Sequence, residues 1–199
     1  MSRLLATDPA QGMDAEVTVP LSDRKLLGAA RRGSAEAVDT LIDRHWDRAN
    51  RIAYGILGDA HAAEDVTQEA MLSIVRNLGR FDPYRPFQPW LHRIVTNKAL
   101  DWTRARARRP EIVVDPLGDS PRTGQIAGDE LSQGEEGDRL REALAALTPD
   151  YRAVIVLRFV AGYGPKETAQ LLGIPAGTVS SRLNRALEQM RKQLEVSDE

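Results

Sequence analysis

The chain has 199 residues, of which 42% are hydrophobic and 28% charged, and its formal net charge is −2. This length suffices for one or two small domains, each able to bury its own core. Because the chain contains no cysteine, disulfides, thiolate metal sites, cysteine nucleophiles and a thiol redox sensor within it are excluded.

The sequence predicts neither a membrane span nor a secreted protein. Its best apolar run, at 153–157, is ended by Arg158 and falls far short of the roughly 20 residues that cross a bilayer. The first residues lack the apolar stretch of a signal peptide, so we expect a cytoplasmic protein with no membrane partner. His45, His61 and His92 lack the close pairing of a metal site, and each is expected to be a solvated or capping helix residue. No metal and no cofactor are expected.

Charge is distributed unevenly along the chain. Residues 1–22 carry one base and three acids, residues 23–110 carry 16 bases and 11 acids, and residues 139–199 carry nine bases and seven acids. Between the two basic blocks, residues 111–138 hold eight acids and one base. The overall acidity therefore comes from the connector and the N-terminal segment, and it does not argue against a nucleic-acid partner.

The apolar pattern predicts an all-α protein. In residues 26–57 and 61–78 the apolar side chains recur at intervals of three and four, as on one face of a helix. A third long helix is expected to begin near Pro89 and to run from Trp90 to about Arg109, because proline is favoured in a first helical turn. No alternating segment of useful length predicts a strand.

One side of the second helical segment is acidic. Within residues 58–74, an exposed helical side carries Glu64, Asp65, Gln68 and Glu69. Such a run is usually a solvated face, and it could equally dock a basic helix of a partner. The residues alone leave both interpretations open.

The third helix has the composition of a single-stranded DNA site. Leu91, Val95, Ala99 and Trp102 share an apolar side, another side carries Trp90, Ile94, Asn97, Asp101 and Arg104, and the end is basic. Bases can stack on aromatic rings, phosphates can pair with arginines, and an asparagine can bind a base edge. For Trp102 we favour a place in the core. Asp101 could instead pair locally with Arg104 or Arg108, and composition does not decide the role of the Asn97 face.

After the acidic stretch, whose Gly, Pro and Ser content is typical of a flexible linker, the C-terminal block predicts four helices. Thr148-Pro149 begins the second, Gly162–Gly164 precedes the third, Gly173 ends it, and Pro175 opens the fourth. The last two helices, with the small Ala169 at their crossing, predict a helix-turn-helix whose second helix enters the major groove of DNA.

The fourth helix divides into two faces when it is counted at about 100° per residue. The predicted core stripe comprises Val179, Leu183, Ala186, Leu187, Met190 and Leu194. Near the helix start, Ser180, Ser181, Asn184 and Arg185 are placed to contact bases or phosphates. Asparagine can bind adenine and arginine can bind guanine through two hydrogen bonds. An amphipathic surface helix with a solvated face is the alternative.

Three stretches in this order and spacing resemble a known family. AEDVTQEAMLSIVRNLGRFDP, PWLHRIVTNKALDWTRARARR and LLGIPAGTVSSRLNRAL are similar to segments of the bacterial extracytoplasmic-function (ECF, group 4) sigma factors, with a resemblance that covers residues 23 to about 195. The resemblance implies a non-catalytic initiation subunit of RNA polymerase with two small helical domains. These are a region 2 domain at 23–110 and a region 4 domain at 139–199, joined by the flexible acidic linker at 111–138. Residues 1–22 have no counterpart in the family and are expected to be disordered.

The resemblance also implies roles for particular residues. The polymerase-binding set, which docks on the β′ clamp helices, is Glu64, Asp65, Gln68 and Glu69. The set that opens and binds the −10 element, together with the loop 79–89, is Phe87, Trp90, Arg93, Asn97, Lys98, Asp101 and Arg104. The set that binds the −35 element is Thr178, Ser180, Ser181, Arg182, Asn184 and Arg185. The implied partners are core RNA polymerase (the β′ clamp helices and the β subunit), promoter DNA and an anti-sigma factor.

Two features of the last motif limit the transfer of promoter sequence. Ser180 stands where the family commonly has lysine or arginine, and Asn184 occupies a position that varies with promoter preference. The main alternative function is a helix-turn-helix regulator that acts without being a polymerase subunit. It predicts a ligand pocket or dimer seam in residues 23–110. An all-helical adaptor would leave the order of the motifs unexplained, and no catalytic constellation predicts an enzyme.

Overall fold

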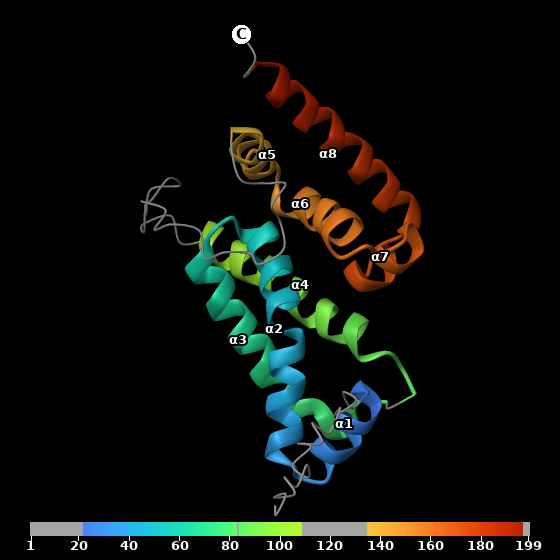
Figure 1. Ribbon diagram of the computed structural model, residues 1–199. Coiled ribbons are helices and arrows are strands. Elements are labelled where there is room, and N and C mark those ends of the chain that lie inside the picture. The colour runs from blue at the N-terminus through green and yellow to red at the C-terminus, as the bar shows by residue number, and fades with distance from the viewer. Residues whose placement is uncertain (1–21, 83, 109–134, 197–199) are drawn as a thin grey trace, which may run out of the picture.

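A computed structural model describes residues 22–82, 84–108 and 135–196, and this part of the chain is helical with no strand (Figure 1). The all-α prediction is therefore confirmed. The predicted N-terminal extension, apart from Ser22, and the acidic linker up to residue 134 lie outside the described residues.

The first bundle consists of α1 (Asp23–Arg31), α2 (Ala35–Leu57), α3 (Ala60–Asn77), the short turn η1 (Leu78–Arg80) and α4 (Phe87–Ala107). The ends of α2 follow from its flanking residues. The Ser34 hydroxyl accepts a hydrogen bond from the Ala37 amide at its start, and Gly58 adopts φ 71° at its end. The Asp59 carboxylate then accepts the Ala62 amide and starts α3 at once, so α2 and α3 form a hairpin.

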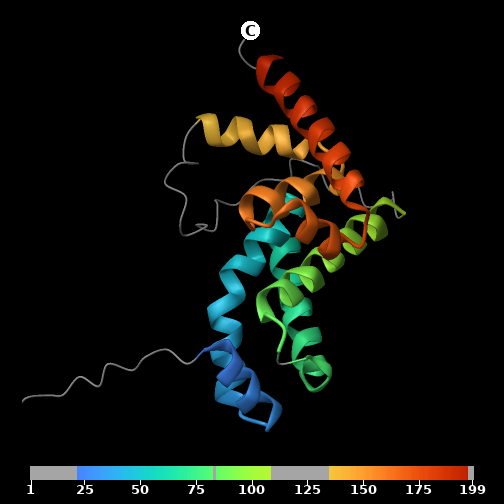
Figure 2. The ribbon, with the colours of Figure 1, turned by 90° about the vertical axis from the view of Figure 1, so that its right-hand side faces the viewer.

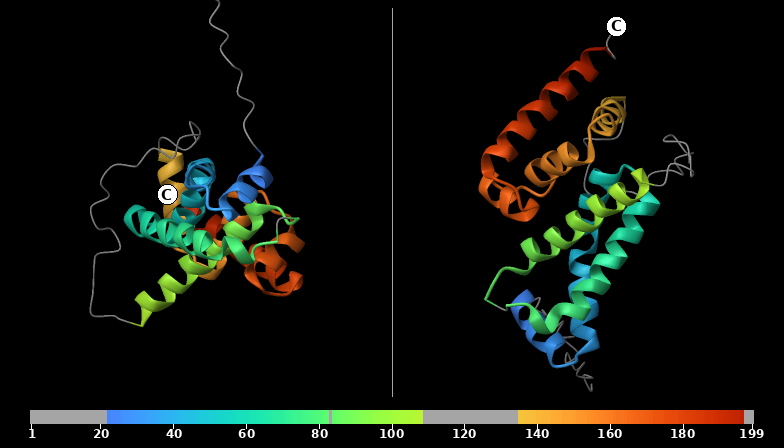
Figure 3. Two further views of the ribbon diagram at one scale, coloured as in Figure 1. Left: turned by 90° about the horizontal axis from the view of Figure 1, so that it is seen from below. Right: turned by 180° about the vertical axis from the view of Figure 1, so that it is seen from behind.

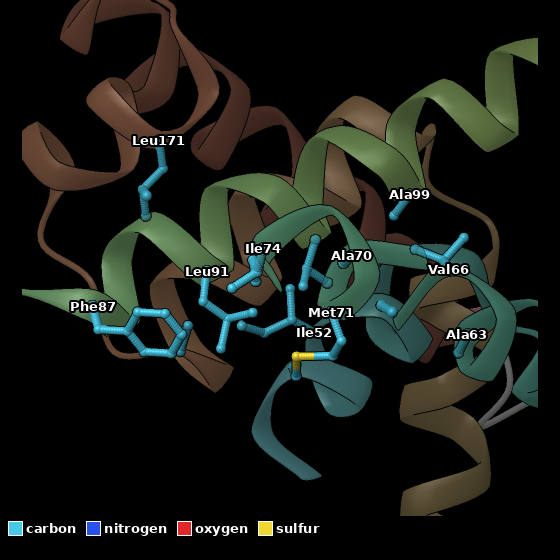
Figure 4. Packing of buried hydrophobic residues seen from close by; sticks show 14 of the residues in the cluster. Ile52, Ala63, Val66, Ala70, Met71, Ile74, Phe87, Leu91, Ala99 and Leu171 are labelled. Atoms are coloured by element: carbon cyan, nitrogen blue, oxygen red, sulfur yellow. The ribbon is translucent and has the colours of Figure 1, made fainter. Parts of the chain in front are cut away.

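The core of this bundle lies where α2, α3 and α4 meet (Figure 4). Ile52 of α2 and Leu91 and Val95 of α4 are fully buried. Burial of an aliphatic side chain of this size stabilises a fold by about 1.5–3 kcal/mol. The apolar periodicity seen in the sequence therefore corresponds to the faces that pack.

The second half consists of α5 (Glu135–Ala145), α6 (Pro149–Ile155), the π-helical turn η3 (Val156–Val160), α7 (Pro165–Leu172) and α8 (Ala176–Val196). Glu167 accepts the Gly164 amide at the start of α7, and Gly173 ends that helix with φ 66°. Both chain breaks expected from glycine and proline are confirmed.

Three local predictions need correction. Helix α4 begins at Phe87, three residues before Trp90, because the Phe87 ring is anchored in the core and Pro89 still falls in the first turn, where backbone amides have no helical partner. Helix α5 begins at Glu135, inside the stretch predicted as linker. Leu187 was placed on the core stripe of α8, yet it is 39% exposed, because the helices packed against α8 cover a narrower arc there.

The two halves are in contact. Helices α6 and α7 and the turn η3 lie against α2 and α4, as the views in Figures 2 and 3 show. Residues of the second half join the core of the first bundle, among them Val156, Leu157 and Leu171, while α5, α6 and α8 also share a separate core around Ala143, Ile155 and Ala186.

Candidate nucleic-acid and polymerase interfaces

One stripe of α4 is free to contact a ligand. Arg93, Asn97, Asp101 and Arg104 recur at intervals of three and four, and all four are exposed. The Arg104 guanidinium donates to the Asp101 carboxylate at 3.1 Å, which is the local pair considered from the sequence. The stripe thus presents the Asn97 amide and the Arg93 charge beside an internal ion pair.

Two aromatic residues of the predicted −10 set lie at the start of α4 and are buried at least in part. Phe87 is 5% exposed, and Trp90 is half-buried and stacks on Phe81 with ring centroids 4.5 Å apart. Trp102 packs against the core, as we favoured, and its ring is covered by the Arg106 guanidinium at 5.0 Å. Direct contact of Phe87 or Trp90 with DNA stays a prediction.

The loop before α4, within the predicted −10 segment 79–89, carries an exposed aromatic residue that the sequence did not single out. Tyr84 is 82% exposed, and the Arg24 guanidinium lies 5.1 Å from its ring centroid. Arg31 donates to the carbonyls of Gly79 and Phe81 and so ties this loop to α1. An isolated tyrosine followed by Arg85 in a loop rich in turn residues was the available signal.

The predicted polymerase-binding set lies on the outer side of α3. Glu64, Asp65, Gln68 and Glu69 are all exposed, and Leu72 on the same side is 49% exposed. Glu69 accepts a hydrogen bond from the Lys98 ammonium of α4 at 3.2 Å. This ion pair brings one member of the −10 set into contact with one member of the polymerase set.

Helices α7 and α8 form the predicted helix-turn-helix. Ala169, Val154 and Val179 pack into one small core at the crossing, which confirms the expected role of Ala169. The Ile174 amide donates to the Ala169 carbonyl and closes the turn. The start of α8 is thereby held in a fixed direction from α7.

The side chains of the predicted −35 residues differ in how exposed they are. Ser180, Ser181, Asn184 and Arg185 are exposed, whereas Thr178 and Arg182 are half-buried. Arg182 donates to the Asp150 carboxylate of α6 at 3.2 Å, and the hydroxyls of Ser180 and Ser181 donate to carbonyls one turn earlier. The polar side chains of Asn184 and Arg185 are the most available for a ligand.

His45 and His92 are buried, whereas the sequence predicted that each is a solvated or capping helix residue. His45 is 7% exposed and bonds Asp23 at 2.8 Å, and His92 is fully buried. Burial, with smaller contributions from the charges of Arg48 and His45, lowers the pKa of His92 to about 3. The imidazole of His92 is therefore neutral at neutral pH.

The partner of His92 lies in the other half of the chain. The Tyr163 hydroxyl and His92 Nδ1 are hydrogen-bonded at 2.7 Å, and burial raises the pKa of Tyr163 to about 12, so the hydroxyl stays protonated. The sequence could not reveal this pair, because 71 residues separate its members.

Nothing in the described residues forms a metal site of three or more histidine, cysteine or acidic side chains. None of the helices described combines the length and hydrophobicity that a membrane crossing requires.

Comparisons with known proteins match both halves. The family model described as Sigma-70 region 2 matches residues 41–109, and the one described as Sigma-70, region 4 matches residues 137–190. ECF RNA polymerase sigma factor SigW of Bacillus subtilis is 32% identical over 181 residues, which cover 86% of this chain and 96% of that protein. ECF RNA polymerase sigma factor SigE of Mycolicibacterium smegmatis is 37% identical over 161 residues, covering 78% of this chain and 61% of that protein.

Solved structures agree with these matches. CnrH in complex with the cytosolic domain of CnrY has a TM-score of 0.63 at 28% identity, covering 87% of this chain and 97% of that one. RpoE from Bartonella quintana, in complex with the anti-sigma factor NepR, has a TM-score of 0.59 at 20% identity, over 86% of this chain and 93% of that chain, and so shows a shared fold.

Proposed function

Because this chain belongs to the extracytoplasmic-function sigma factors of RNA polymerase, we propose that it binds two promoter elements through two separate helices, α4 and α8. It is an alternative sigma factor, a regulatory DNA-binding subunit that directs core RNA polymerase to specific promoters. The observation that carries this conclusion is the match of both sigma-70 regions, in order, within one chain. We assign residues 23–110 to the polymerase and the −10 element, residues 139–199 to the −35 element, and residues 111–138 to the connection.

The −10 element is assigned to the exposed stripe of α4. Asn97 can bind the edge of a base displaced from the duplex, and Arg93 and Arg104 can pair with phosphates. Displacing a base costs a few kcal/mol of stacking, and contacts of about 1–3 kcal/mol per stacked base can offset that cost. Phe87, Trp90 and Lys98 are assigned to the same DNA-binding set; Phe87 and Trp90 pack together at the start of α4, and Lys98 pairs with Glu69.

We assign the start of α8 to binding the −35 element, which it contacts as duplex DNA. Asn184 and Arg185 are exposed next to each other and supply two side chains that can each make paired hydrogen bonds to a base edge. Thr178, Ser180 and Ser181 lie toward the amino end, where a recognition helix meets the groove. Arg182 is held by Asp150 and is assigned to orientation of the helix or to a phosphate.

We assign the acidic side of α3 to binding core polymerase. Glu64, Asp65, Gln68 and Glu69 suit a basic partner surface, which we assign to the β′ clamp helices, and the exposed Leu72 adds an apolar contact. The β subunit of the polymerase is assigned as a further partner of this chain. The protein acts in the cytoplasm, has no catalytic activity of its own, and has an anti-sigma factor as a further partner, as the RpoE neighbour does.

Run-off transcription with purified core enzyme on genomic fragments tests this function. We expect discrete transcripts that appear only when the protein is added. The helix-turn-helix regulator alternative predicts instead tight duplex binding without polymerase and no new start sites with core enzyme alone. Absence of any dependent transcript would contradict the sigma-factor function.

A further inference from the structure

Helix α1 lies outside the segment that matches the region 2 family model, which covers residues 41–109. The helix nevertheless packs on the first bundle, because Leu26, Leu27 and Ala30 are buried in its core. It also contacts η1 and lies beside the loop that precedes α4 (Figure 1). The family match therefore gives α1 no role, although the helix is a neighbour of the predicted −10 segment.

Arg31, at the end of α1, fixes the backbone of this loop. Its guanidinium donates from Nη2 to the Gly79 carbonyl at 3.4 Å and from Nη1 to the Phe81 carbonyl at 3.5 Å. Because the two donors belong to one planar group, the side chain sets a direction as well as a distance. A lysine carries its donors on one nitrogen at the end of a flexible stem and offers no such fixed pair.

The start of α1 reaches the side chain of the loop. The Arg24 guanidinium lies over the Tyr84 ring, 5.1 Å from its centroid, which is within the range of a cation–π contact. Asp23, the residue before it, accepts a hydrogen bond from Arg44 at 2.7 Å and is hydrogen-bonded to His45 at 2.8 Å. These two bonds to α2 fix the end of the helix that carries Arg24.

The Tyr84 ring is available to a ligand. It is 82% exposed, and it belongs to no apolar cluster of the described residues. Since the Arg24 guanidinium can cover only one face of the ring, the opposite face is open. The Tyr84 amide donates to the Asp82 carboxylate and the Arg85 amide to the Asp82 carbonyl, both at 3.0 Å, so a closed turn carries the ring. An exposed aromatic ring on a fixed backbone can stack on a nucleobase.

This ring lies beyond the amino end of the exposed stripe of α4. Tyr84 precedes Phe87, the first residue of α4, by three positions, and Asn97 lies about 15 Å further along that helix. A base bound at Asn97 therefore leaves the Tyr84 ring free for a different base of the same strand. Arg24 supplies a cation beside the ring, where the phosphate of that second base would lie.

We propose that α1 forms part of the single-stranded DNA site. Tyr84 stacks on a base of the displaced strand other than the one assigned to Asn97, and Arg24 pairs with its phosphate. Arg31 is a positioning residue that holds the loop backbone where this stacking is possible. The site accepts any base, because every base has a face that can stack on an aromatic ring. The proposal rests on the proposed function, which assigns a displaced strand to α4.

The experiment uses the full chain bound to core polymerase, on a promoter that gives a dependent transcript. Nucleotides of the displaced strand are replaced one at a time by an abasic analogue, and the lifetime of the open complex is measured. At one position we expect an abasic nucleotide to shorten this lifetime about tenfold, and any exchange of one base for another to change it less than about twofold. This abasic effect should disappear in Tyr84→Ala, persist in Asn97→Ala, and persist in Tyr84→Phe, which keeps the ring.

Variants of α1 separate position from charge. Arg24→Ala should shorten the lifetime about threefold, through loss of the cation beside the ring. Arg31→Ala and Arg31→Lys should both reduce the abasic effect, because neither side chain offers the paired donors. The matched controls are Lys25→Ala and Arg32→Ala, which each remove a positive charge from an exposed neighbouring position and should leave the abasic effect unchanged.

Hydrogen exchange in the free chain tests the role of Arg31 without polymerase. The amides of Phe81 and Arg85 should exchange about threefold faster or more in Arg31→Ala, and at the wild-type rate in Arg32→Ala. An abasic effect that persists in Tyr84→Ala, a strong preference for one base at that position, or equal behaviour of Arg31→Ala and Arg32→Ala would overturn the proposal. If no variant and no wild-type chain gave a transcript, the proposed function would fail, while the exchange rates would still decide whether Arg31 positions the loop.

Discussion

Acidification should favour separation of the two halves of the chain by protonating His92; the arrangement in which α6, α7 and η3 pack against α2 and α4 is here called the closed form. Its pKa is about 3 in the closed form, against an ordinary value of 6.5 once the halves separate. Because the open form binds the proton more tightly, closure is fully stable above about pH 6.5 and loses about 1.4 kcal/mol for each unit below it. Between pH 7.5 and pH 5.5 the ratio of open to closed molecules should therefore rise about tenfold.

Energy transfer between dyes on cysteines introduced at the exposed positions Asp47 and Arg191 measures this ratio, since the chain has no cysteine of its own. The charged and titratable groups that face His92 are Arg48 and His45 of α2 and Tyr163 of the second half, so a control must isolate His92. His92→Asn keeps an oxygen that can accept a hydrogen bond from the Tyr163 hydroxyl, and it removes the titratable imidazole. This variant should stay closed at both pH values. A wild-type response that is absent, or that persists in His92→Asn, would refute the reasoning.

Three substitutions test the other assignments. Asn97→Ala should impair promoter opening in permanganate footprints while polymerase binding is kept, and equal loss of both would make Asn97 a structural residue. Arg185→Ala should weaken binding to −35 duplex DNA by about 1–3 kcal/mol in a fluorescence titration, and an unchanged affinity would remove it from the site. Leu91→Ala, at a fully buried position, should lower the free energy of unfolding by about 2–5 kcal/mol in urea titrations, and a loss under about 1 kcal/mol would contradict its place in the core.

Much of the fold could be predicted from local pattern. The three- and four-residue periodicity located α2, α3 and α4, because one face of each helix packs on the same core. Glycine and proline located the breaks before α7 and α8, because they act through backbone geometry within a few residues. The exposed stripe around Asn97 was also predicted, since a helix face follows from spacing alone.

The remainder depends on contacts between distant residues. Nothing near His92 indicates burial, because the residues that cover it include Tyr163 from the other half. From the sequence alone, Gly55 is only a residue that weakens a helix. The structure shows that its missing side chain makes room for Val156. The same holds for Leu187, whose exposure depends on how wide an arc of α8 the neighbouring helices cover. Sequence periodicity describes a helix face and does not say what covers it.

Footprinting of one promoter with the protein and core polymerase together tests the central claim most directly. The account predicts protection of two separate segments about 25 base pairs apart, with permanganate-reactive thymines only in the downstream one, and neither signal with core enzyme alone. Protection of a single duplex segment by the protein without polymerase, and no strand opening when polymerase is added, would contradict it.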